Sequence, residues 1–510
     1  MKFRFEIIIL LFIAISVVIL QVPYIFEFPG HIHGWAQADR LALANGFIRN
    51  GFDLFHPETQ VFNHIYPHDF SVQASSTITA VDCPLHDYTV AFLMKLLGIH
   101  SPVVFRFYVL FMSVLGLVFL GKLSLMILKD EIKALFVVFF AALSPVFVYY
   151  QGTLLPSIPS LSFVIMGVFF YLRFREMKHD RDFHVATSCL GIALIARTTF
   201  VIPFVAMLAL ELLDFVKSRK WSSTRLVSVL LVMGFFLLSR VQNQFLTDEY
   251  GSMFLNHLMP PDSLDQAISL LNHIWTHWRF TYFSSIHYWA VLIIGVVLCI
   301  NHFFKPSGQR VDKWMAYFVG IYFFGCSLFA GAMLKQFQDH DYYFLDTFYL
   351  PCILLLILLL AYAPAANRPD RKWLYGSLIV IFIGSSFRMP QRSQRSRHEW
   401  SENDRLQMSI LDYQGSDLFL DEIDVPPNAT ILVMDAMSPN TALTMMNRKG
   451  LVVMNTERHV MENAFRWNFD YVVFQNDYLN GKFKVDYPEM LTKLSLVATN
   501  GKISVFRMLE

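Results

Sequence analysis

The chain has 510 residues, of which 55% are hydrophobic and 16% are charged. Soluble globular proteins carry about 25% charged residues, so this composition excludes an ordinary cytosolic enzyme and a disordered chain. A formal net charge of +1 leaves no basic surface to neutralise phosphates, which also excludes a nucleic-acid partner. What remains is a membrane protein with polar segments outside the bilayer.

Eleven apolar segments predict helices that cross the membrane, because such a helix needs about 20 apolar residues. The first runs from Ile7 to about Ile25, after Lys2 and Arg4, and no small-residue cleavage site follows it. It therefore predicts an uncleaved anchor. The other ten lie near 103–127, 133–150, 156–173, 183–197, 199–216, 224–242, 288–304, 314–333, 345–363 and 372–387.

The polar connectors between these segments predict the orientation in the membrane. Four short connectors are rich in Lys and Arg, and they fall on the same side as the N-terminus: 173–181, 217–225, 305–313 and 368–372. The positive-inside rule makes that side cytoplasmic. The long segments 27–102 and 243–287 and the C-terminal residues are then outside, and residues 1–387 form the predicted transmembrane domain.

The tail, residues 388–510, has the composition of a soluble domain. ATILVMD, LVVMNT and YVVFQN read as buried strands, separated by helical stretches near 439–448 and 458–467. LSLVATNGKISVF predicts a hairpin with a type I′ turn at Asn500-Gly501. We expect a small extracytoplasmic α/β domain, joined to the last apolar segment by a linker at 388–407.

The polar sequence PGHIHGWAQADR follows the first apolar segment directly. Leu41, Ala44, Phe47 and Ile48 come next on one helical face, which predicts a helix lying in the membrane interface with Asp39 in its first turn. A carboxylate at that place either caps the helix or acts where a lipid headgroup meets a water-borne acceptor. Both interpretations remain open.

His31 and His33 lie in the same polar sequence. They either anchor the segment at the interface or ligate a metal, although the sequence identifies no third ligand for such a pair. A divalent metal is therefore left open, and no other cofactor is indicated.

Four further segments resemble the GT-C glycosyltransferases, and most closely the branch of aminoarabinose transferases and bacterial protein-mannosyltransferase-like enzymes. They are CPLHDYTVAFLMKLLGIHSPVVFRFYVLFMSVLGLVFLGKL (83–123), LSPVFVYYQGTLLPSIPSL (143–161), LGIALIARTTFVIPF (190–204) and HDYYFLDTFYLP (340–351). Together with Asp39 they occur in the family's order over roughly residues 1–365. Two features differ: Asp82-Cys83-Pro84-Leu85 lacks the Lys of the aminoarabinose transferases, and no second acid follows Asp39.

The resemblance implies a polytopic α-helical membrane protein of the GT-C type, in the bacterial plasma membrane. It implies transfer of a hexosyl or pentosyl group from a polyprenyl-phosphate donor, on the extracytoplasmic side and with inversion. The acceptor is a hydroxyl of a glycan, a lipid or a protein. Membrane lipids surround the enzyme.

Several residues are candidates for this chemistry. Asp39 is the predicted general base, since an acceptor hydroxyl must lose its proton as the new bond forms. Asp82 either orients the acceptor, helps to hold a divalent ion, or is only a turn residue. The candidates for substrate binding are His33, Trp35, Gln37, Arg106, Arg197, His340 and Tyr342.

Among the substrate-binding candidates, Arg197 is the first choice for the lipid phosphate. The alternative for it and for Arg106 is a cation that snorkels to the surface. His340 is expected to donate to the phosphate and Tyr342 to line the sugar pocket, or both belong to an aromatic interface belt. A transporter or a flippase for lipid-linked glycans is the alternative function. A polysaccharide ligase or polymerase of another fold is the third.

Overall fold

The computed structural model of the chain describes residues 2–62, 76–218, 222–255, 257–304, 313–366, 369–401 and 403–509. Parts of three predicted basic connectors (219–221, 305–312 and 367–368) lie outside the described residues, as do residues 63–75 of the first predicted external segment.

The chain folds into two compact units, each assembled from three segments of the sequence. The helical unit contains residues 1–25, 106–239 and 257–397, and the mixed unit contains residues 26–105, 240–256 and 398–510. The mixed unit thus combines most of the predicted tail with the first predicted external segment and with the start of the second.

The helices before the tail account for most of the fold. They are α1 (Lys2–Leu20), η1 (Val22–Tyr24), α2 (Gly34–Arg49), α3 (Leu85–Leu97), α4 (Pro102–Leu128), α5 (Glu131–Ala142), α6 (Pro145–Tyr150), α7 (Ser157–Met177), α8 (Asp180–Ala196), η2 (Thr198–Phe200), α9 (Val201–Ser218), α10 (Ser223–Tyr250), α11 (Leu264–Tyr282), α12 (Ser285–Phe304), α13 (Lys313–Ala332), α14 (Leu334–Asp339), α15 (Tyr342–Asp346), α16 (Tyr349–Tyr362) and α17 (Pro369–His398).

The tail alternates short helices and strands. These are α18 (Arg405–Tyr413), α19 (Ser416–Glu422), β1 (Ile431–Met434), α20 (Thr441–Met445), β2 (Gly450–Val453), α21 (Arg458–Ala464), β3 (Tyr471–Gln475), α22 (Asn476–Tyr478), η3 (Leu479–Phe483), α23 (Lys484–Asp486), α24 (Pro488–Leu491), β4 (Leu494–Thr499) and β5 (Ile503–Met508).

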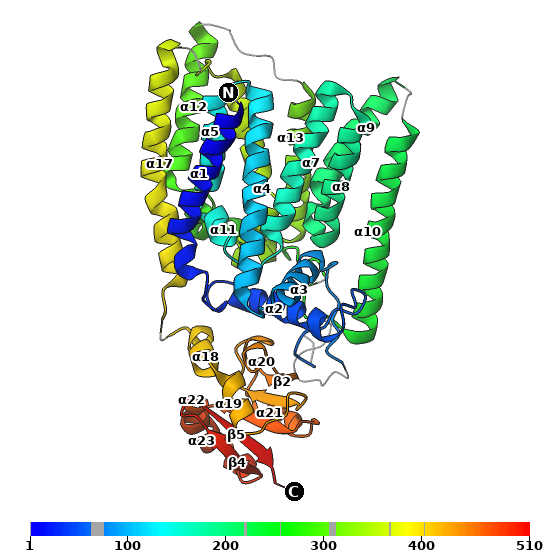
Figure 1. Cartoon of the computed structure of the whole chain (residues 1–510), viewed down its shortest axis with the longest axis vertical. Helices are drawn as coiled ribbons and strands as arrows, with labels where there is room; N and C mark the ends of the chain where they lie inside the picture. Colours follow the sequence, from blue (N-terminus) through cyan, green and yellow to red (C-terminus); the bar gives the residue numbers. More distant parts are fainter. Residues whose placement is uncertain are drawn as a thin grey trace. The chain divides into compact units, whose positions relative to one another are not determined.

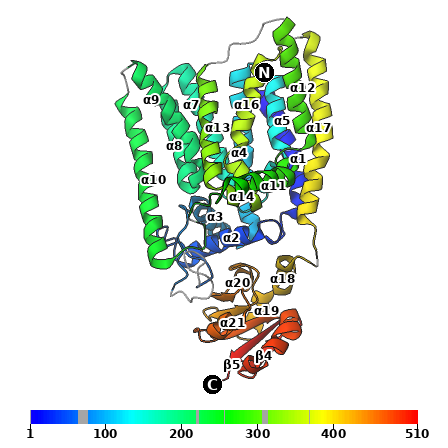
Figure 2. The same cartoon turned by 180° about the vertical axis from the view of Figure 1, so that it is seen from behind.

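Every one of the eleven predicted apolar segments coincides with helix. Figures 1 and 2 show the long helices of the helical unit running alongside one another, with α11 lying across them. The segment 133–150 is divided into α5 and α6, because Pro145 cannot continue the hydrogen-bonded ladder of α5. Within the described residues, five helices are long and apolar enough to cross a membrane. The pair α11 and α12, bent by 89° between them, would make a sixth.

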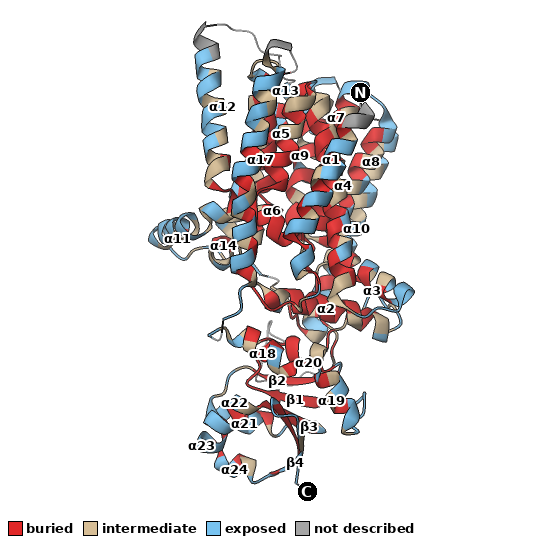
Figure 3. Ribbon diagram, turned by 60° about the vertical axis from the view of Figure 1, so that its left-hand side comes forward, coloured by how far each residue is buried: buried red, intermediate tan, exposed pale blue. Residues whose placement is uncertain are grey.

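The outer faces of this unit are apolar, as a lipid solvent requires. Figure 3 shows buried residues gathered between the helices and exposed residues on their outer sides. The exposed side chains include Leu231, Phe235 and Leu238 of α10 and Ile293 of α12. Continuous apolar surface of this kind is rare on a monomeric protein in water, and it marks contact with a membrane or a partner.

The predicted linker at 388–407 is wrong in its first half, because α17 continues as a helix to His398. Two of its polar side chains are buried. Gln394 is buried and donates from Nε2 to the carbonyl oxygen of Leu20, 3.1 Å away, and Arg397 is buried against Asp341. Internal partners therefore stabilise a polar segment whose composition is typical of a linker.

The tail forms a five-stranded sheet in the order β2-β1-β3-β5-β4. Strands β1, β2 and β3 are parallel, and β5 pairs antiparallel with β3 and β4. The three predicted buried strands and the hairpin are confirmed. The predicted type I′ turn is wrong, because that turn needs two successive positive φ angles and in this turn Gly501 alone has one.

The first external segment pairs with the edge of this sheet. Val61 forms a parallel bridge to Gly450, whose N–H donates to the carbonyl oxygen of Gln60 at 3.0 Å. The N–H of Phe62 donates to the carbonyl oxygen of Gly450 at 2.8 Å. The contact covers the free edge of β2, which would otherwise be open to pairing with another chain.

Candidate active site

Asp39 lies in the second turn of α2, not in the first turn as predicted. The helix begins at Gly34, and its N-cap residue is His33, which has a φ of 57° and makes no side-chain cap. The interpretation of Asp39 as a helix cap is therefore wrong. The role of its carboxylate follows instead from its other contacts.

The carboxylate of Asp39 is held by neutral donors. Its side chain is buried, with 3% of the residue exposed, and Oδ1 accepts a hydrogen bond from Asn440 Nδ2 at 2.8 Å. Trp35, one turn earlier on α2, also hydrogen bonds to it. Burial raises the pKa of Asp39 to about 7, although these two bonds and the charge of Arg40 act in the opposite direction. Asp39 therefore changes protonation state near neutral pH.

Asn440 connects Asp39 to the first external segment. It lies directly before α20, and while its Nδ2 donates to Asp39, its Oδ1 accepts from the N–H of Gln60 at 3.1 Å. Both ends of the amide are thus in use, which fixes its orientation. Asn440 was not among the predicted site residues, since nothing in its sequence context distinguishes it from an ordinary helix cap.

Helix α2 is buried on most of its surface, and both polar and apolar side chains are buried. Arg40 is buried and donates from Nη1 to Oδ2 of Asp87 at 3.2 Å. Gly46 packs so closely that an added Cβ would lie 1.9 Å from the carbonyl oxygen of Glu58. Burial lowers the pKa of the neighbouring His86 to about 3, so its ring is neutral.

The other candidates in the mixed unit have separate contacts. Asp82 forms an ion pair with Arg240, with Oδ1 and Nη1 3.0 Å apart. Gln37 is buried and donates from Nε2 to the carbonyl oxygen of Ile32 at 3.3 Å. Trp35 is partly exposed in the first turn of α2, which follows the N-cap residue His33. Of these candidates, Trp35 hydrogen bonds to Asp39.

The candidates Arg197, His340, Tyr342 and Arg106 belong to the helical unit. Arg197 lies between α8 and α9, and its Nη2 is 2.7 Å from Oδ2 of the buried Asp346. Its guanidinium carbon is 5.4 Å from the ring centre of Tyr342 and 5.7 Å from that of Tyr343. The predicted cation thus has a carboxylate partner and an aromatic wall, both from the segment that begins at His340.

His340 ends α14, and its ring lies 5.4 Å from the ring of Tyr342. Its Nδ1 is 3.2 Å from the carbonyl oxygen of Gln336. Arg106 is buried and donates to two backbone carbonyls, from Nε to Gly152 at 3.0 Å and from Nη1 to Ile25 at 2.8 Å. Arg106 therefore links α4 to the backbone at Ile25 and at Gly152.

A second buried ion pair lies in the same aromatic region. Asp341 accepts from Arg397 Nη2 at 2.5 Å and from the hydroxyl of Tyr150, whose ring is 6.0 Å from that of Tyr342. Asp341, Asp346 and Arg397 are not among the predicted site residues. The sequence signal for the two aspartates is their place within HDYYFLD, beside His340 and Tyr342.

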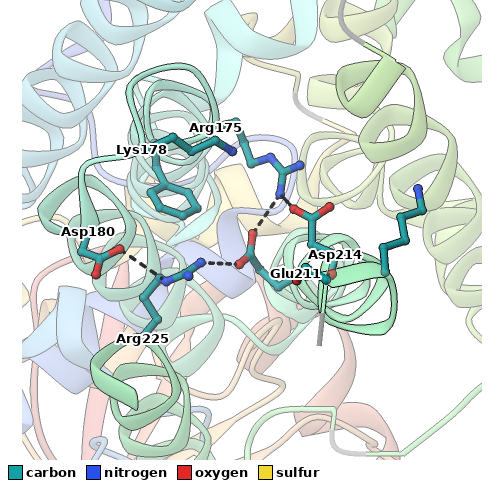
Figure 4. A pocket seen from close by; sticks show the side chains of 9 residues that line it. Arg175, Lys178, Asp180, Glu211, Asp214 and Arg225 are labelled. Carbon is teal, nitrogen blue, oxygen red and sulfur yellow. Dashed lines mark hydrogen bonds and ion pairs between the residues drawn. The ribbon is translucent and has the colours of Figure 1, made fainter. Parts of the chain in front are cut away.

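A cavity of about 360 Å³ lies elsewhere in the helical unit, among the ends of α7, α8, α9 and α10. Figure 4 shows that Arg175, Glu211, Asp214 and Arg225 point toward one another there. Arg175 and Arg225 pair with opposite oxygens of Glu211, at 3.2 and 3.0 Å. The residues that line this cavity include none of the predicted site residues.

Comparison with known proteins identifies related folds. Residues 81–241 match the family model of dolichyl-phosphate-mannose-protein mannosyltransferases. The crystal structure of ArnT from Cupriavidus metallidurans bound to undecaprenyl phosphate is similar with a TM-score of 0.59 and 10% sequence identity, over 98% of this chain and 97% of that one. No curated relative matches the chain by sequence.

Two further crystal structures have similar folds. ArnT from the same organism in the apo state gives a TM-score of 0.51 at 12% identity, covering 98% of this chain and 97% of that one. The apo oligosaccharyltransferase of Archaeoglobus fulgidus gives a TM-score of 0.55 at 12% identity, covering 96% of this chain and 73% of that one. The similarity therefore extends over nearly the whole chain.

Proposed function

Because the chain has the GT-C glycosyltransferase fold that its sequence predicted, we propose that it transfers a sugar from a polyprenyl-phosphate donor to an acceptor hydroxyl, outside the cytoplasm and with inversion. The observation that carries this proposal is the environment of the Asp39 side chain. Its buried carboxyl group has neutral hydrogen-bond donors and a pKa of about 7. A general base is most effective when its pKa lies near the working pH.

The proposed step is a single displacement at the anomeric carbon. Asp39 removes the proton of the acceptor hydroxyl while the acceptor oxygen forms a bond to the anomeric carbon, on the face opposite the departing phosphate. The bond between that carbon and the phosphate oxygen breaks, and the lipid phosphate leaves with both electrons. One displacement from the opposite face inverts the configuration.

The leaving phosphate gains negative charge, which requires a cation or hydrogen-bond donors aimed at it. We assign this role to Arg197, with His340 as a further donor. Asp346 and the rings of Tyr342 and Tyr343 hold the guanidinium of Arg197 in place. The ring of Tyr342 is the proposed wall for the sugar. Asp82, paired with Arg240, is assigned to orienting the acceptor.

The proposal is tested by the envelope glycans of a strain that lacks this protein. The strain is complemented with the wild-type chain or with Asp39→Asn, and its glycans are compared with those of the parent by mass spectrometry. We expect one sugar modification to disappear on deletion, to return with the wild type and to remain absent with Asp39→Asn at normal membrane levels.

Asp53→Asn is the matched control, because Asp53 is exposed in the same unit and contacts His56 at 2.7 Å. It should restore the modification. A transporter or flippase has no need of a base, so full restoration by Asp39→Asn would favour that alternative and reject the assignment of Asp39.

A further inference from the structure

Three side chains with metal-binding chemistry meet in the mixed unit, two of them shortly before α2 and one far along the sequence. They are Glu27, His31 and His398, which form the group of candidate ligands found among the described residues. His33, the expected partner of His31, is not part of this group. The third ligand comes instead from the end of α17, 371 positions after Glu27.

The spacing of the donor atoms suits a single small ion. Oε2 of Glu27 is 3.2 Å from Nε2 of His31 and 2.9 Å from Nδ1 of His398, and all three ligand atoms lie within 4.8 Å of one another. Zinc binds His nitrogen and carboxylate oxygen at about 2.0–2.2 Å, so neighbouring ligands around a tetrahedral ion are about 3.3 Å apart. A small movement of each side chain admits the ion.

The surroundings keep the ligands in place but leave one side accessible. The side chain of His31 is 3% exposed, whereas that of Glu27 is 29% exposed. The ring of His31 packs 4.6 Å from that of His398 and 5.4 Å from that of Trp400. Solvent therefore reaches the carboxylate side, and a water molecule can complete the coordination.

Gln407 supplies a polar contact behind His31, since its Nε2 lies 3.1 Å from Nδ1 of His31. In this arrangement His31 carries its proton on Nε2 and donates it to Glu27. Metal binding at Nε2 moves the proton to Nδ1, and Oε1 of Gln407 accepts it only after the amide turns and gives up the 2.7 Å bond from the N–H of Ser401. Such a contact orients a metal-bound histidine.

We propose that Glu27, His31 and His398 bind one Zn²⁺ ion together with a water molecule. Two imidazole nitrogens favour zinc over magnesium or calcium, which prefer oxygen ligands. The ion links residues 27–31 to residue 398, beside 25/26 and 397/398, two of the five places where the chain passes from one compact unit to the other. This inference does not depend on the proposed transferase activity.

The test uses the full-length protein purified in detergent and treated with a chelator. After incubation with Zn²⁺ and removal of excess metal, elemental analysis should find one zinc per chain. Co²⁺ in its place should give the visible absorption of a tetrahedral site. Glu27→Gln, His31→Ala and His398→Ala should each weaken zinc binding tenfold or more and abolish this spectrum.

The control is His273→Ala with His277→Ala, a stacked histidine pair on the exposed surface of α11 whose ring centres are 3.9 Å apart. This double variant should bind zinc as the wild type does. Zinc should also raise the Tm of the wild type and of the control, but not that of the near-isosteric Glu27→Gln. Absence of bound zinc in the wild type would show a metal-free hydrogen-bonded cluster and overturn the proposal. Unchanged binding by all three ligand variants would do the same.

Discussion

Asp39 in the mixed unit and Asp346 in the helical unit are both buried aspartates, but their partners differ. Asp39 is held by the amide of Asn440 and by Trp35, whereas Asp346 is paired with the guanidinium of Arg197. A neutral hydrogen-bond donor does not balance the charge of a buried carboxylate, so its ionisation remains unfavourable. Its pKa therefore rises, and the group can take up a proton. A guanidinium fixes the charge, and the pair then serves to hold a cation in position.

The largest expected effect is that of Asp39→Asn on the rate of sugar transfer. Loss of a general base lowers the rate by about 10²–10⁴-fold. The amide cannot accept a proton from the acceptor, yet it fills the same volume. The measurement is the transfer rate in proteoliposomes, with Tm as the control for folding. A rate within threefold of the wild type would contradict the assignment.

Asp346→Asn should instead act mainly on stability. Removing one member of a buried ion pair leaves the other charge without its partner and costs about 3–5 kcal/mol. We expect a marked fall in the Tm and in the amount of folded protein in detergent.

Replacing both members of this pair, with Arg197→Met and Asp346→Leu, should restore much of the lost stability, because apolar residues of similar volume need no partner. Such a protein would still lack the cation assigned to the lipid phosphate and should remain inactive. If the single variant were as stable as the wild type, the pair would not hold Arg197 in the way we describe.

Asn440→Ala should shift the pH dependence of the rate. With the pKa of Asp39 at about 7, the wild-type rate should rise as the pH increases through 7, because only the ionised carboxylate accepts a proton. Asn440 donates to that carboxylate and lowers its pKa. A hydrogen bond to a charged group contributes about 1.5–3 kcal/mol, so its loss should move the rising limb upward by about one pH unit or more.

The same groups predict how the free energy of unfolding varies with pH. A carboxyl group whose pKa is raised by folding binds more protons in the folded state, so its contribution to stability falls as the pH rises from about 4 to 7. Asp39→Asn removes this contribution. Its free energy of unfolding should therefore decline less over that interval than that of the wild type, measured by denaturant titration at several pH values.

The smallest effect is expected at Asp82. Its ion pair with Arg240 is partly exposed, and pairs of that kind contribute about 0–1 kcal/mol. Asp82→Asn should leave the Tm nearly unchanged. If Asp82 orients the acceptor, the same variant should raise the KM for the acceptor several-fold, while Arg240→Gln serves as the matched control for loss of the ion pair alone.

The sequence predicted the parts of the molecule that have a local pattern. Apolar runs located the helices, and the buried strands and Gly501 located the sheet and its hairpin. Contacts between distant residues have no such pattern, so the bond from Asn440 to Asp39, the pair of Asp82 with Arg240 and the approach of His398 to Glu27 were not predictable. The end of α17 was misread for the same reason, because the partners of Gln394 and Arg397 lie far away in the sequence.

The bond between Gln60 and Asn440 spans 380 positions of the chain, and the pairing of Val61 with Gly450 spans still more. A ribosome adds about 5–20 residues each second, so roughly 20–75 s separate the synthesis of the two partners of the first bond. Throughout that interval Asp39 has no Asn440 to receive a hydrogen bond from. In the proposed orientation, the newly inserted protein therefore lacks the hydrogen bond that lowers the pKa of Asp39 until the residues around Asn440 have been exported.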